Sequence, residues 1–84
     1  MRRAMKLQVL MAGMYQIPKG KKVEFTYDNG YGVYLASSDG KTFGLAQSLE
    51  GKKRNRLKRL GSKFRGSVVE SMPQERKVIV KIKG

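Results

Sequence analysis

Cysteine and histidine are both absent from this chain. Without cysteine there is no disulfide and no thiolate nucleophile, and without either residue most zinc sites are excluded. The absence of histidine also removes the commonest general base of enzymes. We therefore expect no metal, no cofactor and no catalytic activity. The composition suits a reducing compartment.

Long apolar runs are also lacking. No segment approaches the ~20 consecutive apolar residues that a membrane-spanning helix needs. Arg2, Arg3 and Lys6, followed by the mostly apolar stretch 7–14, imitate the first two regions of a signal peptide. Gln8 interrupts that stretch, however, and the sequence behind it continues as a domain rather than a cleavage site. We therefore expect a cytoplasmic or nucleoid-associated protein.

Negative charge is scarce, because six acidic residues stand against nineteen basic ones and give a formal net charge of +13 in 84 residues. A chain of this length forms one domain, here residues 1–84. So many cations repel one another unless water or a partner neutralises them. The partner that we expect is nucleic acid. An anionic membrane is not expected, because helices that lie on membranes carry a wide apolar face, and the basic helix predicted below has a narrow one.

Alternating apolar residues predict six short strands. On the first strand, one face consists of Met5, Leu7, Val9 and Met11. Asn29-Gly30 is typical of a two-residue type I′ hairpin turn, and Asp39-Gly40 turns the chain again. The predicted strands are residues 4–12, 22–27, 31–37, 41–47, 64–71 and 76–83, of which the second to fourth form a meander.

One helix is predicted at residues 49–60, with Ser48 as its N-cap and Glu50 near the positive end of its dipole. Gly61 is placed to end it. Its apolar side is predicted to consist of Leu49, Leu57, Leu60 and Phe64. These elements together predict a mainly β fold. We expect a small barrel of about six strands, OB-like (oligonucleotide-binding) or SH3-like, with one basic α-helix between strands four and five.

The segment 51–66 holds eight Lys or Arg residues and no acid. A helix face that is merely solvated normally mixes both signs for i,i+4 pairing, so this asymmetry indicates phosphate binding, aided by backbone N–H groups at the helix N-terminus. A second, smaller basic patch follows the first strand. It is either the opposite wall of a groove, which the neighbouring Tyr15 favours, or only a solvated loop. The predicted phosphate-binding residues are Lys52, Lys53, Arg54, Arg56, Arg59, Lys63 and Arg65 in the first segment, and Lys19, Lys21 and Lys22 in the second.

Four tyrosines, Tyr15, Tyr27, Tyr31 and Tyr34, cluster around the first loop and the meander. Aromatic rings interleaved with cations are typical of proteins that bind single strands, because bases stack on them. Tyrosines are also ordinary strand residues whose hydroxyl reaches water. Both interpretations stay open at this point.

One pattern superficially matches a metal-dependent nuclease, namely Asp39 followed by Glu50-Gly51-Lys52. That chemistry needs the Glu-x-Lys on a rigid strand so that both groups meet one metal ion. Here Asp39 belongs to a predicted turn and Lys52 to the start of the predicted helix. No phosphate-cradling glycine motif is present either. We therefore do not expect an enzyme.

Several short motifs resemble the HIRAN domain: Leu10…Gly13…Tyr15, Lys22-Val23, Tyr27-Asp28, Val33-Tyr34-Leu35, Asp39-Gly40-Lys41…Gly44, Leu57…Leu60-Gly61 and Val68-Val69. The resemblance covers most of the chain. It implies a modified OB barrel that captures the 3′ end of single-stranded DNA. In such a barrel Tyr27 would pack on the terminal base, and Asp28 would accept a hydrogen bond from the terminal hydroxyl.

The chain also departs from that family. The longer run that follows Tyr-Asp in the family is reduced here to Asn29-Gly30-Tyr31-Gly32, and its Arg-Tyr-Tyr appears only as Met14-Tyr15-Gln16. A shorter likeness, Phe25-Thr26-Tyr27-Asp28 and the glycines behind it, is to a hairpin of small archaeal chromatin proteins that bind duplex DNA.

The sequence therefore predicts a nucleic-acid-binding module without catalytic activity, with single-stranded DNA or a DNA 3′ end as the favoured ligand and DNA favoured over RNA. Tyr15, Tyr27, Tyr31 and Tyr34 are the predicted stacking residues, with Asp28 for end recognition. Two alternatives stay open. One is a protein–protein or inhibitor module that docks on an acidic protein surface, and the other is a small RNA-binding protein.

Overall fold

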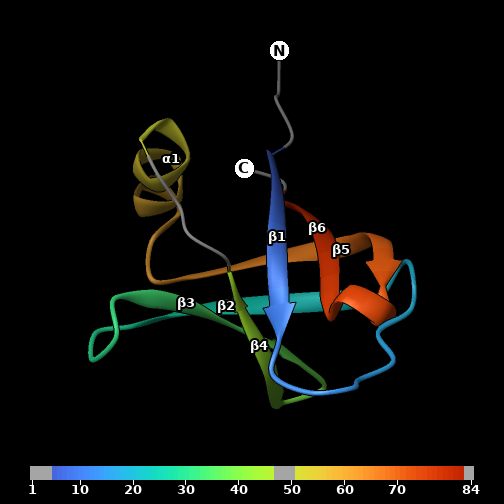
Figure 1. Cartoon of the computed structure of the whole chain (residues 1–84). Coiled ribbons are helices and arrows are strands. Elements are labelled where there is room, and N and C mark those ends of the chain that lie inside the picture. The colour runs from blue at the N-terminus through green and yellow to red at the C-terminus, as the bar shows by residue number, and fades with distance from the viewer. Residues whose placement is uncertain (1–4, 47–50, 83–84) are drawn as a thin grey trace.

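The computed structural model describes residues 5–46 and 51–82. These residues form six antiparallel strands and one α-helix, arranged as Figure 1 shows. The elements in chain order are β1 (Met5–Met11), β2 (Lys22–Asp28), β3 (Val33–Ser38), β4 (Lys41–Ala46), α1 (Lys52–Leu60), β5 (Lys63–Met72), the short 3-10 helix η1 (Pro73–Glu75) and β6 (Lys77–Ile82). Within the described residues, no helix is long and apolar enough to cross a membrane.

The six strands close into a barrel in the order β1-β4-β3-β2-β5-β6. The meander β2-β3-β4 makes one side, and β5 returns after α1 to pair with β2. β1 closes the ring between β4 and β6. The prediction of a mainly β barrel of six strands, with its helix between strands four and five, is therefore confirmed.

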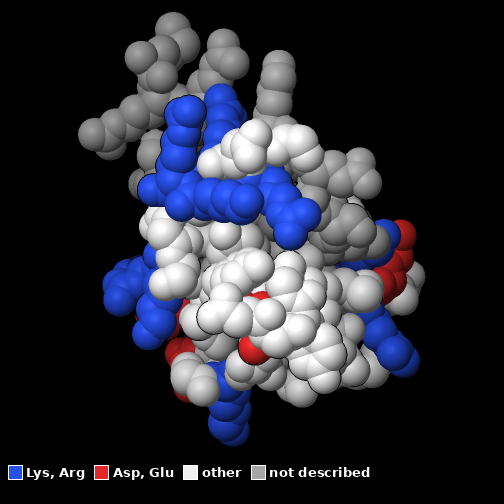
Figure 2. All heavy atoms as spheres, turned by 90° about the vertical axis from the view of Figure 1, so that its left-hand side faces the viewer, with Lys and Arg blue, Asp and Glu red and all other residues white. Residues whose placement is uncertain are grey.

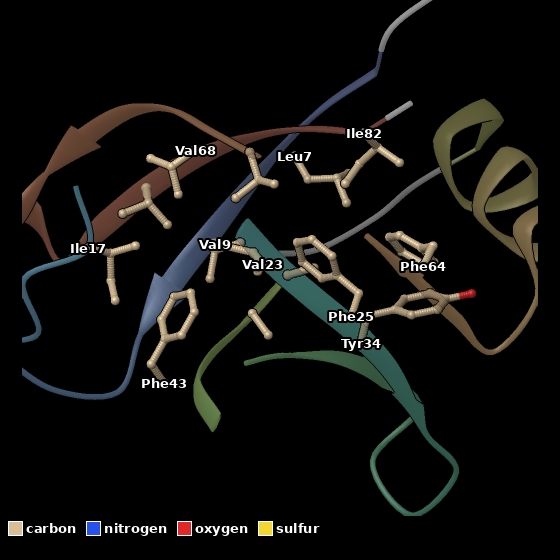
Figure 3. Packing of buried hydrophobic residues seen from close by; sticks show 14 of the residues in the cluster. Leu7, Val9, Ile17, Val23, Phe25, Tyr34, Phe43, Phe64, Val68 and Ile82 are labelled. Carbon is tan, nitrogen blue, oxygen red and sulfur yellow. The ribbon is translucent and has the colours of Figure 1, made fainter. Parts of the chain in front are cut away.

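The two-residue period of the strands explains most of the core. In β1, Met5, Leu7, Val9 and Met11 are buried, while the residues between them are exposed. The same alternation in the other strands fills the barrel interior, as the close-up in Figure 3 shows. The core also includes Ile17 of the β1–β2 loop, Val23, Phe25, Tyr34, Ala36, Phe43, Ala46, Leu57, Phe64, Val68, Val78, Val80 and Ile82.

The two hairpin turns of the meander differ from each other. Asp39 and Gly40 both have positive φ, 54° and 79°, and Ser38 pairs directly with Lys41. A two-residue turn of this kind needs two left-handed residues, and the predicted turn at this position is confirmed.

The predicted two-residue turn at Asn29-Gly30 is wrong. The loop between β2 and β3 contains residues 29–32, and of these only Gly32 has positive φ, 68°. Asp28 closes it, because its backbone oxygen accepts from Gly32 N–H at 2.8 Å and its Oδ2 accepts from Tyr31 N–H at 2.9 Å. An Asp side chain that replaces a backbone acceptor stabilises a longer turn. As a result β3 begins at Val33 instead of residue 31, and Tyr31 lies in the loop.

The helix is shorter than predicted at its start. Gly51 has φ 59° and ψ −123°, which is incompatible with a helix, so α1 begins at Lys52 without a side-chain cap. The predicted N-terminal residues Ser48, Leu49 and Glu50 lie outside the described residues. Gly61, with φ 94°, ends α1 as predicted.

Leu57 packs α1 onto the end of the barrel. Its side chain is fully buried, and Leu60 is half-buried against the same core. Phe64 belongs to β5, as the predicted strand 64–71 requires, and it packs on Phe25 from inside the barrel. The helix is therefore held on the barrel by few side chains, and most of its surface faces solvent.

Candidate functional site

A cleft of about 740 Å³ lies between α1 and the meander. It opens on the side of the molecule that carries α1 and the β2–β3 loop. Figure 2 shows this side, where Lys and Arg side chains gather above a broad surface that is mostly uncharged and contains a few acidic atoms. The lining residues are Tyr27, Gly32, Val33, Tyr34, Leu45 and Ala46 from the meander, and Arg54, Lys58, Gly61 and Ser62 from α1 and the segment behind it.

Two tyrosines bring an aromatic surface into this cleft. The rings of Tyr27 and Tyr34 meet edge to face, with centroids 5.1 Å apart. Behind them, Tyr34 contacts Phe64 at 5.2 Å, and Phe64 stacks on Phe25 at 5.0 Å. The row of four rings runs from the barrel core to the cleft, so the core fixes the position of the two tyrosines.

Tyr34 is only 6% exposed, yet its hydroxyl points toward α1 (Figure 3). None of the hydrogen bonds between described residues engages this hydroxyl. Burial raises the pKa of Tyr34, the neighbouring Tyr27 raises it further, and the charge of Arg54 opposes both. The phenol is therefore neutral at physiological pH and can donate a hydrogen bond into the cleft.

The cations of the cleft come from one face of α1. Leu57 points into the barrel, so the positions that flank it, Arg54 and Lys58, lie beside the cleft one helical turn apart. Arg56 and Arg59 are exposed elsewhere on the helix. Of Lys52 and Lys53 only the backbone is described.

The cleft runs along α1 from Arg54 in its first turn to Gly61 behind its end. The expectation that phosphates bind at or near the helix N-terminus stays a prediction, and the cleft adds one cation to the predicted set. Lys58 was not among the predicted phosphate-binding residues. The sequence did contain a signal that Lys58 belongs to the site. Arg54 and Lys58 are four residues apart and lie on the same side of the buried Leu57, so both border the buried face of the helix.

The second basic patch lies away from the cleft. Lys19, Lys21 and Lys22 precede or begin β2, whereas Tyr27 lies near its other end, and a seven-residue strand spans roughly 20 Å. Lys21 is also engaged, since its Nζ lies 2.6 Å from Oδ2 of Asp39 in the β3–β4 turn. These lysines and α1 are therefore not two walls of one groove, which corrects that prediction.

Lys63 and Arg65 are exposed on the outside of β5 and do not line the cleft. Arg65 faces Glu24 of β2, its cross-strand partner, with Nε 3.4 Å from Oε1. A pair this exposed contributes little to stability. Both side chains can still contact an anion, but they lie on a part of the surface outside the cleft.

The other predicted ligand residues are dispersed. Tyr15 is 44% exposed and packs edge-on against Phe43, with ring centroids 6.4 Å apart. Tyr31 is 86% exposed in the β2–β3 loop. Asp28 is half-buried, holds that loop through Tyr31 N–H, and is not one of the lining residues. The structure therefore brings together Tyr27, Tyr34 and Arg54 of the predicted residues and adds Lys58 and Ser62.

The described residues offer no group of three or more acidic side chains that could hold a metal ion. Asp39 of the nuclease-like pattern pairs with Lys21, and Glu50 lies outside the described residues.

Comparison of the chain with protein-family models, curated proteins and solved structures gives no match. The likeness to the HIRAN domain stays a prediction. The function must therefore be inferred from the cleft itself.

Proposed function

We propose that this protein binds single-stranded nucleic acid, with DNA favoured, in the cleft between α1 and the β2-β3-β4 meander. One observation carries the proposal: a cleft of about 740 Å³ combines two tyrosine rings with two helix cations, and none of the described residues that line it is acidic. Proteins that bind single strands use this combination, in which cations follow the phosphates and aromatic rings stack on the bases. The net charge of +13 adds long-range attraction.

The shape of the site favours a single strand over a duplex. Tyr34 is only 6% exposed and Tyr27 is half-buried, whereas the α1 cations Arg54 and Lys58 are exposed. A paired base in a duplex presents only its edges, so its face cannot reach a ring in a cleft without leaving the stack. An unpaired base meets no such cost. Each base that stacks on an aromatic ring contributes roughly 1–3 kcal/mol.

Recognition of a 3′-hydroxyl by Asp28, which the HIRAN resemblance implies, has less support. One oxygen of this carboxylate is used by Tyr31 N–H, and Asp28 does not line the cleft. We therefore base the proposal on Tyr27, Tyr34, Arg54 and Lys58.

A binding panel tests the proposal directly. Fluorescence anisotropy would compare a single-stranded oligothymidylate, the matching RNA and a duplex at several salt concentrations. If four to six phosphates of a single strand are neutralised, log K should fall with log salt at a slope of about −3 to −4. We expect the single strands to bind more tightly than the duplex, and competition between DNA and RNA decides which strand is preferred.

A pair of variants localises the site. Tyr27→Leu should weaken single-strand binding about tenfold, the lower part of the range for one stacked base. Tyr15→Leu makes the same substitution at a tyrosine that does not line the cleft, so it serves as the matched control. Binding that is independent of salt, or an equal loss in both variants, would contradict the proposal.

A further inference from the structure

Among the described residues that line the cleft, every polar side chain can donate a hydrogen bond. These donors are the guanidinium of Arg54, the ammonium of Lys58 and the hydroxyls of Ser62, Tyr27 and Tyr34. Such a set suits a compact group with many acceptor oxygens and more than one negative charge. A phosphate inside a strand has one charge and two free oxygens, whereas a phosphomonoester has three oxygens and a charge of about −1.5 to −2 at neutral pH.

Arg54 and Lys58 are spaced for one such group. Residues four apart on a helix lie roughly 6 Å from each other, so their charged ends can meet on the same phosphate. Charge-assisted hydrogen bonds of this kind are about twice as strong as neutral ones. The cleft is also large enough, because about 740 Å³ lies within the range of small-molecule sites, about 300–1,000 Å³.

Tyr34 supplies an independent indication. Its ring is fixed between Tyr27 and Phe64, its hydroxyl points toward α1, and that hydroxyl has no hydrogen-bond partner among the described residues. The donor is therefore held in place before any ligand arrives, which reduces the entropy lost on binding. Arg54 lines the same cleft, and its charge lowers the pKa of the phenol against the effect of burial. A phosphate oxygen between these two side chains would be contacted from both sides.

We propose that the cleft recognises the phosphorylated end of a nucleic-acid strand, with the terminal phosphomonoester held by Arg54, Lys58 and the Tyr34 hydroxyl and the adjoining base against Tyr27. This rests on the proposed single-strand binding and names the part of the strand that the same cleft selects. It is the opposite of reading a free 3′-hydroxyl, because a hydroxyl end lacks the second charge. A 5′-phosphate and a 3′-phosphate offer the same group, so probes must distinguish them.

The experiment measures the affinity of the full chain for one oligothymidylate with different ends. The probes carry a 5′-phosphate, a 5′-methylphosphate, a 3′-phosphate, hydroxyls at both ends, or are circular. We expect one phosphorylated end to bind about tenfold more tightly than the hydroxyl-ended strand. The methylphosphate has nearly the same size but only one charge, so it should lose most of that gain. Equal affinity of all probes would overturn the inference.

Two variants connect the preference with the cleft. Tyr34→Phe keeps the ring and removes the hydroxyl, so the affinity ratio between the phosphorylated and the circular strand should fall severalfold. Arg59→Ala removes a charge of α1 that does not line the cleft, so it should leave that ratio unchanged. A ratio that survives Tyr34→Phe, or that falls equally in Arg59→Ala, would reject this assignment.

The two proposals fail in different ways. If every probe binds equally and with a steep salt dependence, single-strand binding stands and end recognition is wrong. If no probe binds, or none responds to salt, the proposed function itself is wrong.

Discussion

Removing the two cations that line the cleft should change the salt dependence of binding by a definite amount. Each cation that neutralises a phosphate of a single strand contributes about 0.7 to the slope of log K against log salt. The double variant Arg54→Ala/Lys58→Ala should therefore have a slope shallower by about 1.4. Both side chains are exposed, so the free energy of unfolding should change by less than about 1 kcal/mol in total.

A charge-matched control separates local contacts from the overall charge. Lys19→Ala/Lys22→Ala also removes two positive charges, from exposed residues before and at the start of β2. Lys22 lies five residues before Tyr27 on β2, roughly 17 Å away, and Lys19 precedes the strand. This distance is about two Debye lengths of about 8 Å at physiological salt. Their loss should therefore hardly affect the slope.

The assay is anisotropy of a labelled oligothymidylate over a series of KCl concentrations, with circular dichroism to establish that each variant is folded. If the slope of log K against log salt becomes shallower by the same amount in both double variants, the ligand responds to the overall charge of the protein and not to cations in the cleft. If neither loses any slope, α1 does not contact the phosphates. Either result would refute the reasoning from the structure.

Three further predictions concern stability. Leu57→Ala should lower the free energy of unfolding in urea by about 2–5 kcal/mol, because its side chain is fully buried under α1; a loss below about 1 kcal/mol would mean that the helix is held in another way. The pKa of Tyr34 is raised by burial, so the folded state keeps this proton at a pH where the unfolded chain loses it. The contribution of Tyr34 to the free energy of unfolding should thus be fully present below about pH 10 and be lost as the pH rises further. In Tyr34→Phe, the free energy of unfolding measured in urea should therefore decrease less between neutral and alkaline pH than in the unchanged protein. Gly44→Ala should lower Tm markedly, since a Cβ there would collide with the carbonyl oxygen of Leu10 across the β1–β4 pair, whereas Gly30→Ala has ordinary φ and only van der Waals contact with Asp28 and should be nearly neutral.

The barrel was predictable because its signals are local. The alternation of Met5, Leu7, Val9 and Met11 decides which face of β1 is buried, whatever the partner strand is. Gly61 ends α1 for an equally local reason, since it adopts a left-handed conformation that most residues avoid. The six strands and the α-helix could therefore be inferred from the sequence, whereas the short 3-10 helix η1 could not.

Errors arose where a side chain or distant residue decides the local structure. Asn29-Gly30 has the composition of a two-residue turn, but Asp28 supplies a side-chain acceptor and Gly32 the left-handed residue, so the loop is longer. The start of α1 was missed because Gly51 could have been a helical residue by sequence alone.

The candidate site was only partly predictable for the same reason. The sequence identifies cations and tyrosines but does not say which of them meet. Lys21 pairs with Asp39 across the barrel end, while Lys58 joins Tyr27 and Tyr34 because Leu57 fixes the rotation of α1. Such neighbours depend on strand order and helix orientation, which no short segment contains. The ligand itself remains a proposal that the experiments above test.

The way in which α1 is attached also makes the protein a convenient scaffold. The hydrogen-bonded ring of six strands closes without any contribution from the helix, which is bounded by Gly51 and Gly61 and contacts the core through Leu57 and Leu60. The residues at positions 54, 55, 56, 58 and 59 are all exposed, so they can be exchanged with little effect on the barrel. A library of substitutions at these five positions would vary the ligand preference while the fold stays constant. Selection from such a library could yield binders for other anionic targets on the same small, cysteine-free frame.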